Sequence, residues 1–173
     1  MARLYLGGPS GCGKTLAIKQ INDLYPHISC LSGSQIMMRA AGVLTREELN
    51  LLSPAKKDVL RETAFSSYYA AAKNLILEGH FFLTETDARF IDSFVLVEVS
   101  VESLIRFRNS DSSRIRGIDL DDITQEVEVI EKRVFDFENK FEIKVVRISN
   151  DSSLDKLVST ILFCYSAISG AMY

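Results

Sequence analysis

Short apolar runs alternate with amphipathic stretches along this chain of 173 residues. The apolar runs have the length of buried strands, whereas the amphipathic stretches space their apolar residues three or four positions apart, as on one face of a helix. Strands that are apolar on both faces are typical of a parallel sheet covered by helices on both sides. The pattern therefore predicts an α/β protein.

Five strands and the helices between them can be placed from this pattern. The apolar centres of the strands are expected at Leu4–Leu6, Ile28–Leu31, Phe81–Leu83, Phe94–Val97 and Ile143–Ile148. Helical spacing is found at 14–24, 34–41, 54–79, 100–109, 121–137 and 154–165.

Polar residues predict where several helices begin. Thr45-Arg46-Glu47-Glu48 forms a capping box that opens a further short helix. Ser53-Pro54 combines an N-cap with proline at the first helical position. Ser100 and Asp121 are expected to cap the two helices after the fourth strand.

The segment Leu75–Glu78 can be interpreted in two ways. It can end the long helix, with Gly79 as the stop, or it can itself be the third strand, with Glu78 or His80 as the polar group at its end. We favour the helix, because Gly79 then serves as a C-cap and Phe81–Leu83 as the strand.

The junction of the first strand and the first helix carries a complete G-x-x-x-x-G-K-[ST] motif. Its glycines allow consecutive N–H groups to turn around an anion, and the following helix directs the positive end of its dipole to the same place. A glycine-rich turn that binds nothing is the alternative, but a strand directly before the motif favours a phosphate-binding loop. The residues expected to hold the triphosphate of ATP are Gly8, Ser10, Gly11, Cys12, Gly13, Lys14 and Thr15, with Lys14 on the β- and γ-phosphates and the Thr15 hydroxyl on Mg²⁺.

Composition narrows the functional classes. The chain shows no repeat or linker and suits a single domain over 1–173. Its formal charge of −3 does not indicate a basic surface for binding duplex nucleic acid or an anionic membrane. A nucleic acid as the phosphate acceptor remains an alternative, since basic residues can cluster locally. No apolar run approaches a membrane span. Three cysteines without metal-ligand spacing favour a reduced, cytoplasmic setting.

Other classes of phosphate-loop protein fit less well. A switch GTPase needs a D-x-x-G motif, which the sequence lacks, and Asn139–Glu142 only approximates N-K-x-D and lies before a strand instead of after one. A motor ATPase needs an apolar strand that ends in paired acids, which we do not find.

Three further segments carry the chemistry of phosphoryl transfer. Glu85-Thr86-Asp87-Ala88-Arg89 follows the expected third strand, and Ser32-Gly33-Ser34 precedes a helix that contains Arg39. Four arginines surround a short polar segment: Arg106, Arg108, Arg114 and Arg116. Guanidinium groups suit this reaction because they bind phosphate oxygens in pairs and stay charged.

Together with the phosphate loop, these segments resemble the nucleoside monophosphate kinases and the archaeal-type adenylate kinases. The resemblance implies a three-layer P-loop kinase fold with a five-stranded parallel sheet in the order 2-3-1-4-5. It implies an acceptor arm at about 33–60 and a lid at about 109–119. Glu85 would organise the water shell of Mg²⁺, and Lys14, Arg108, Arg114 and Arg116 would promote transfer. Arg89 would bind the phosphate of a nucleoside monophosphate acceptor, and Arg39 and Asp87 would belong to the same acceptor site.

Departures from the family pattern leave other functions open. Proline is missing from Glu85–Arg89, and Glu stands where the family usually has Asp. One alternative is a kinase that phosphorylates a hydroxyl of a nucleoside, a coenzyme or a nucleic acid, with Asp87 at the acceptor as general base. Another is a regulatory ATPase that resembles adenylate kinase.

Overall fold

Five parallel strands form the centre of the protein in a computed structural model that describes residues 1–80, 83–110, 117–151 and 153–170. The order in the sheet is β2-β3-β1-β4-β5, which confirms the predicted fold class. The strands are β1 (Ala2–Gly7), β2 (Ser29–Ser32), β3 (Asn74–Glu78), β4 (Ser93–Glu98) and β5 (Val145–Ser149).

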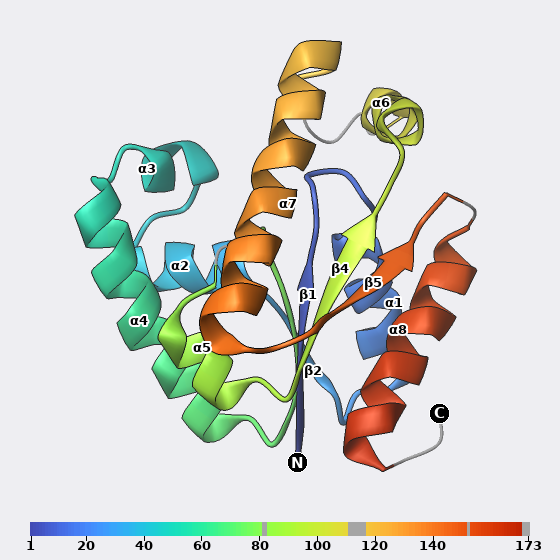
Figure 1. The fold of residues 1–173 in the computed structure, drawn as a ribbon. Coiled ribbons are helices and arrows are strands. Elements are labelled where there is room, and N and C mark those ends of the chain that lie inside the picture. The colour runs from blue at the N-terminus through green and yellow to red at the C-terminus, as the bar shows by residue number, and fades with distance from the viewer. Residues whose placement is uncertain (81–82, 111–116, 152, 171–173) are drawn as a thin grey trace.

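Helices cover both faces of this sheet (Figure 1). They are α1 (Lys14–Leu24), α2 (Gly33–Ala41), α3 (Arg46–Asn50), α4 (Pro54–Ala71), α5 (Glu85–Phe90), α6 (Val101–Ser110), α7 (Leu120–Phe141) and α8 (Leu154–Ser169). On one face, α1 and α8 pack against each other and against the sheet. On the other face, α2, α4, α5 and most of the apolar side of α7 enclose a second core.

The central strand shows why both faces are covered. Leu4 and Leu6 point into the core with α1 and α8, whereas Tyr5 points into the core with α4 and α7. All six residues of β1 are buried. Alternation of side chains along a strand that is buried on both faces requires a helical layer on each side.

The third strand lies earlier than we expected. Strand β3 is formed by Asn74–Glu78, and α4 ends at Ala71, where Ala72 leaves the helical conformation. Leu75–Leu77 pair with β1 on one side and β2 on the other, and burial on both faces outweighs their compatibility with helical spacing. Of the strand expected at Phe81–Leu83, the first two residues lie outside the described residues, and Leu83 belongs to no strand.

Helix starts follow the expected chemistry with one exception. The capping box of Thr45 and Glu48 and the cap at Ser53 are confirmed. The cap of α7 is Asp119 and not Asp121, because the Asp119 carboxylate accepts from the N–H groups of Asp121 and Asp122. Among the described helices, none is long and apolar enough to cross a membrane.

Candidate functional site

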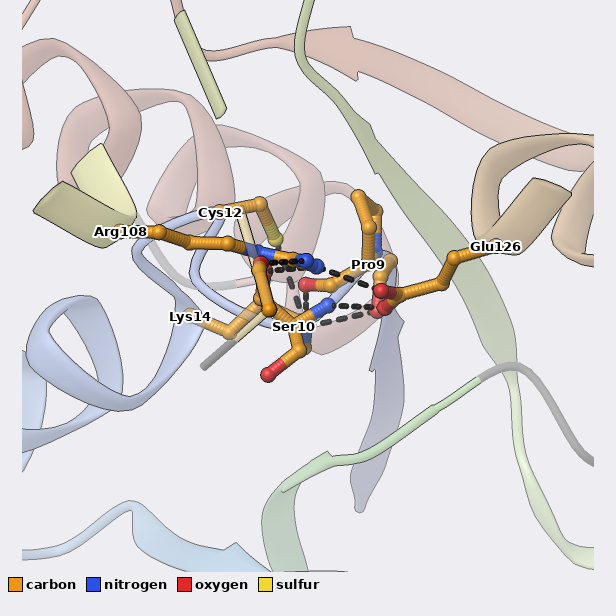
Figure 2. A network of polar contacts seen from close by, with 8 residues as sticks. Pro9, Ser10, Cys12, Lys14, Arg108 and Glu126 are labelled. Carbon is orange, nitrogen blue, oxygen red and sulfur yellow. Dashed lines mark hydrogen bonds and ion pairs between the residues drawn. The ribbon is translucent and has the colours of Figure 1, made fainter. Parts of the chain in front are cut away.

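The phosphate loop joins β1 to α1 at the carboxyl end of the sheet (Figures 1 and 2). Gly13 precedes the helix with a φ of 91°, which only glycine adopts without strain. A β-carbon on Gly13 would lie 2.9 Å from the Asn150 side-chain nitrogen. Glycine is therefore required here by both backbone conformation and space.

Side chains of the protein hold the carbonyl groups of this loop. Lys14 is 5% exposed, and its Nζ donates to the carbonyls of Gly8 at 2.8 Å and Pro9 at 2.9 Å. Asn150 donates to the Cys12 carbonyl at 2.9 Å. In a trans peptide the next N–H points opposite to the carbonyl, so these contacts also set the direction of the loop amides.

An acidic residue and a hydroxyl meet beside the loop. Thr15 Oγ1 donates to Glu78 Oε1 at 3.3 Å, and Glu78 is 5% exposed at the end of β3. Carboxylate and hydroxyl oxygens, completed by phosphate oxygens and water, are ligands that Mg²⁺ accepts. The two side chains therefore fit a magnesium ion bound together with a triphosphate.

Glu85, which we expected in this place, lies elsewhere. It is the first residue of α5, its side chain is 73% exposed, and it pairs with Arg89 at 3.5 Å one helical turn away. The earlier position of β3 is the reason, because the residue at the end of the strand is now Glu78. The alternative interpretation of Leu75–Glu78, a third strand with Glu78 as the polar group at its end, is the correct one.

One pocket of about 610 Å³ runs along the loop and beyond it at both ends. At one end its walls come from α6 and from the segment between β5 and α8, and they include Phe107, Ser110, Asn150, Ser153 and Leu154. At the other end they come from β1, β2, α2, α3, α4 and the segment at the end of β3, and they include Tyr5, Ser32, Ser34, Arg46, Arg61 and His80. The volume is in the range of ligand-binding clefts.

Two arginines that we did not predict line the second end of the pocket. Arg46 donates to the Ser34 hydroxyl at 2.8 Å. Arg61 is 8% exposed and forms an ion pair of 2.8 Å with Asp87, which is fully buried. A signal for Arg61 existed in the sequence, since it lies on the same helical face as Phe65 and Tyr69, the two apolar residues that α4 buries.

Asp87 is the centre of a buried polar cluster. Its carboxylate accepts from Arg61, from the Tyr69 hydroxyl and from the N–H and hydroxyl of Thr84. Burial by itself lowers the pKa of Arg61, but the adjacent Asp87 carboxylate outweighs it, and the pKa is raised. Burial and the same carboxylate raise the pKa of Tyr69, so that its hydroxyl stays a donor. The cluster fixes the Arg61 guanidinium at the pocket.

The other predicted arginines are distributed differently. Arg39 is exposed in the last turn of α2, and Arg89 is 71% exposed, so neither is brought to the pocket. Arg108 is buried, and its guanidinium group donates to the backbone carbonyl of Ser10 in the phosphate loop, as Figure 2 shows. Arg106 is exposed on α6, and Arg114 and Arg116 lie outside the described residues.

Comparison with known proteins gives a family and a fold. The sequence profile of a family described as an AAA domain matches residues 7–126. No curated protein sequence matches the chain. A solved structure of shikimate kinase from Acinetobacter baumannii, in complex with shikimate, covers 100% of this chain and 96% of its own, with a TM-score of 0.71 and 15% identity. A gluconokinase from Sinorhizobium meliloti 1021 covers 98% of this chain and 94% of its own, with a TM-score of 0.62 and 12% identity.

Proposed function

This chain belongs to the AAA-domain family matched over most of its length, and we propose that it transfers the γ-phosphoryl group of Mg·ATP to a small acceptor. The observation that carries the proposal is a single pocket with a phosphate loop in its middle and two arginines at one end. A site built only to hydrolyse ATP has no need of the arginine-lined end.

The donor is assigned to the loop and to the α6 end of the pocket. Lys14 would exchange its carbonyl partners for phosphate oxygens, and the loop amides and the start of α1 would bind the same group. Thr15 and Glu78 would hold Mg²⁺, which neutralises charge on the transferred phosphoryl group. Phe107 and Leu154 offer apolar surface to the base.

The acceptor is assigned to the end of the pocket with Arg46 and Arg61. Guanidinium groups select an anionic group on the acceptor, either carboxylate or phosphate. Shikimate and gluconate, after which the two kinases of similar fold are named, are hydroxylated carboxylic acids. We therefore favour a small hydroxy acid that is phosphorylated on a hydroxyl, with the imidazole of His80 at the pocket wall to take its proton.

A nucleoside monophosphate is the second candidate. It is supported by the same two arginines, which suit a phosphate as well as a carboxylate. One observation weighs against it: Arg39 and Arg89, the arginines that the kinase resemblance assigns to the acceptor site, are exposed and do not line the pocket. Asp87 does not serve as the general base of the hydroxyl reaction, because it is fully buried and bonded to Arg61.

An acceptor screen with γ-labelled ATP and Mg²⁺ tests the proposal. The panel contains hydroxylated carboxylic acids, nucleoside monophosphates, nucleosides and oligonucleotides, and Lys14→Ala is the inactive control. Label transferred to a hydroxy acid supports the favoured function, and label on a monophosphate supports the second. Release of inorganic phosphate with no labelled acceptor in any member of the panel would contradict both and favour a regulatory ATPase.

A further inference from the structure

Ser10, in the first half of the phosphate loop, is bound on both sides of its backbone by side chains from two other helices (Figure 2). Its N–H donates to Glu126 Oε1 of α7 at 2.6 Å. Its carbonyl accepts from Nε and Nη2 of Arg108 of α6 at 3.0 and 2.9 Å. Arg108 and Glu126 also pair with each other at 2.5 Å, so the three residues form a closed set of contacts.

This part of the loop has little conformational preference of its own. The residue after Ser10 is Gly11, with a φ of 87°, and a glycine on one side of a peptide lowers the cost of turning that peptide over. A turned Ser10–Gly11 peptide would direct a carbonyl dipole to the side on which the anion binds. Arg108 opposes this rotation by donating to the Ser10 carbonyl. Glu126 fixes the preceding peptide by accepting from the Ser10 N–H.

The contact is close-packed as well as polar. A β-carbon on Gly11 would lie 3.1 Å from Arg108 Cγ, so the arginine side chain lies directly against the loop. The Arg108 side chain is 5% exposed, and its Nη1 also donates to the carbonyl of Gly117 at 2.9 Å. The Glu126 side chain is 27% exposed. The Arg108 side chain is therefore held in one position, and the Glu126 carboxylate neutralises the charge of its guanidinium group.

We propose that Glu126 is a positioning residue for the triphosphate: with Arg108 it selects the orientation of the Ser10 peptides that binds phosphate. The inference rests on the proposed function, since it requires that the loop binds a triphosphate. It assigns no contact between Glu126 and substrate. A carboxylate is needed because one of its oxygens accepts from the Ser10 N–H while the other faces the guanidinium.

The test is the affinity for a non-hydrolysable ATP analogue with Mg²⁺, measured by calorimetry on the full chain. Glu126→Ala removes both contacts, and we expect the Kd to rise about tenfold. Glu126→Gln keeps an oxygen for one contact and loses the charge, and we expect a rise of about threefold. Glu128→Ala is the matched control, because Glu128 is a carboxylate on the same helix that is exposed to solvent, and its Kd should equal that of the parent.

Kinetics separate positioning from a general loss of structure. We expect the KM for ATP to rise in both Glu126 variants, while kcat at saturating ATP and the KM for the acceptor stay within twofold of the parent. An unchanged or lower Kd in Glu126→Ala would overturn the inference, the lower value indicating that the carboxylate competes with phosphate. If Glu126→Ala does not fold, an unchanged or lower Kd in Glu126→Gln would overturn the inference instead. A parent that binds no triphosphate would overturn the proposed function, and the inference with it.

Discussion

At the scale of single residues, Lys14 illustrates how the loop combines stability with binding. Its ammonium group is buried against the carbonyls of Gly8 and Pro9, and not only directed at a ligand. A substitution here therefore leaves two loop carbonyls without this donor and, under the proposed function, also removes a group that binds phosphate.

We predict that Lys14→Ala abolishes detectable binding of Mg·ATP and also lowers the free energy of unfolding, by about 1–3 kcal/mol, the cost of losing the donor of buried acceptors. Calorimetry and urea denaturation measure the two effects. Lys14→Arg is the comparison variant, because it keeps a cation but not its size. Parental ATP affinity in Lys14→Ala would contradict the assignment of the donor site.

Asp87 and Glu85 lie in the same short helix and form ion pairs of opposite character. The Asp87–Arg61 pair is buried, whereas the Glu85–Arg89 pair is exposed on both sides. Removing one charge of a buried pair leaves the other uncompensated in a medium of low polarity, whereas water solvates the partner of an exposed pair.

We therefore predict that Asp87→Asn lowers the free energy of unfolding by about 3–5 kcal/mol, and that Glu85→Gln lowers it by less than about 0.5 kcal/mol. Denaturation in urea, with the two variants side by side, checks the difference. Equal losses in the two variants would show that burial does not govern these pairs.

Arg46 and Arg89 permit a similar comparison for acceptor binding. Arg46 lines the pocket, and Arg89 does not. With the best acceptor from the screen, Arg46→Ala should raise the KM of that acceptor at least tenfold, which corresponds to about 1.4 kcal/mol. Arg89→Ala should leave it unchanged, and the KM for ATP should be parental in both. A large effect of Arg89→Ala alone would move the acceptor site to the surface of α5.

At the scale of elements, the sequence predicted most helices and strands because their signals are local. The capping box at Thr45 and the proline after Ser53 act within one turn, so they need no tertiary context. The prediction of the third strand was wrong, because its signal is not local. Leu75–Leu77 fit both a helical stripe and a buried strand, and only pairing with β1 and β2, which are distant in sequence, decides between them.

The same error carried over to the candidate site. A shift of the strand end from about residue 83 to Glu78 replaced Glu85 by Glu78 beside Thr15. The assignment of the phosphate loop was unaffected, because its motif lies between β1 and α1 and does not depend on where the third strand ends. The helical face that Arg61 shares with Phe65 and Tyr69 was a signal that it is buried. Its partner Asp87, twenty-six residues away in the chain, could not be assigned from the sequence.

Helix α3 gives a pH-dependent prediction. The Glu48 carboxylate accepts from the N–H groups of Leu44 and Thr45, and these bonds lower the pKa of Glu48 below its ordinary value of 4.5. A lowered pKa in the folded state means that the stabilisation is complete above the ordinary pKa and is lost as the pH falls through the lowered one. Amide exchange in α3 should therefore accelerate in that acidic range.

Glu48→Gln is the control for this effect, because a glutamine does not titrate and its α3 should show no such acceleration. Arg46 is the first residue of α3, so the KM for the acceptor should rise over the same range in the parent. Identical pH profiles of exchange in the parent and the variant would contradict the role of Glu48.

At the scale of the whole molecule, the sheet positions a site that no single helix of the protein could form alone. The carboxyl ends of β1, β2 and β3 carry the loop, Ser32 and Glu78, which meet at one edge because the strands are parallel. Helices α3 and α4 bring the arginines to one end of the pocket, and α6 and the start of α8 form the other. A ligand that bridges both ends joins elements from both faces of the sheet.

Binding of Mg·ATP should therefore stabilise the whole fold. At a concentration one hundred times its Kd, a ligand that binds only the native state contributes about 2.7 kcal/mol, or roughly 5–10 °C in Tm for a chain of this size. We expect this shift in a thermal melt with Mg²⁺ and ATP, and a smaller one when EDTA removes the metal, because Thr15 and Glu78 then lose the ion they share with the phosphates. Glu78→Gln should reduce the difference between the two melts, and Lys14→Ala should show neither shift. A shift that is equal with Mg²⁺ and with EDTA in the parent would contradict the placement of the metal between Thr15 and Glu78.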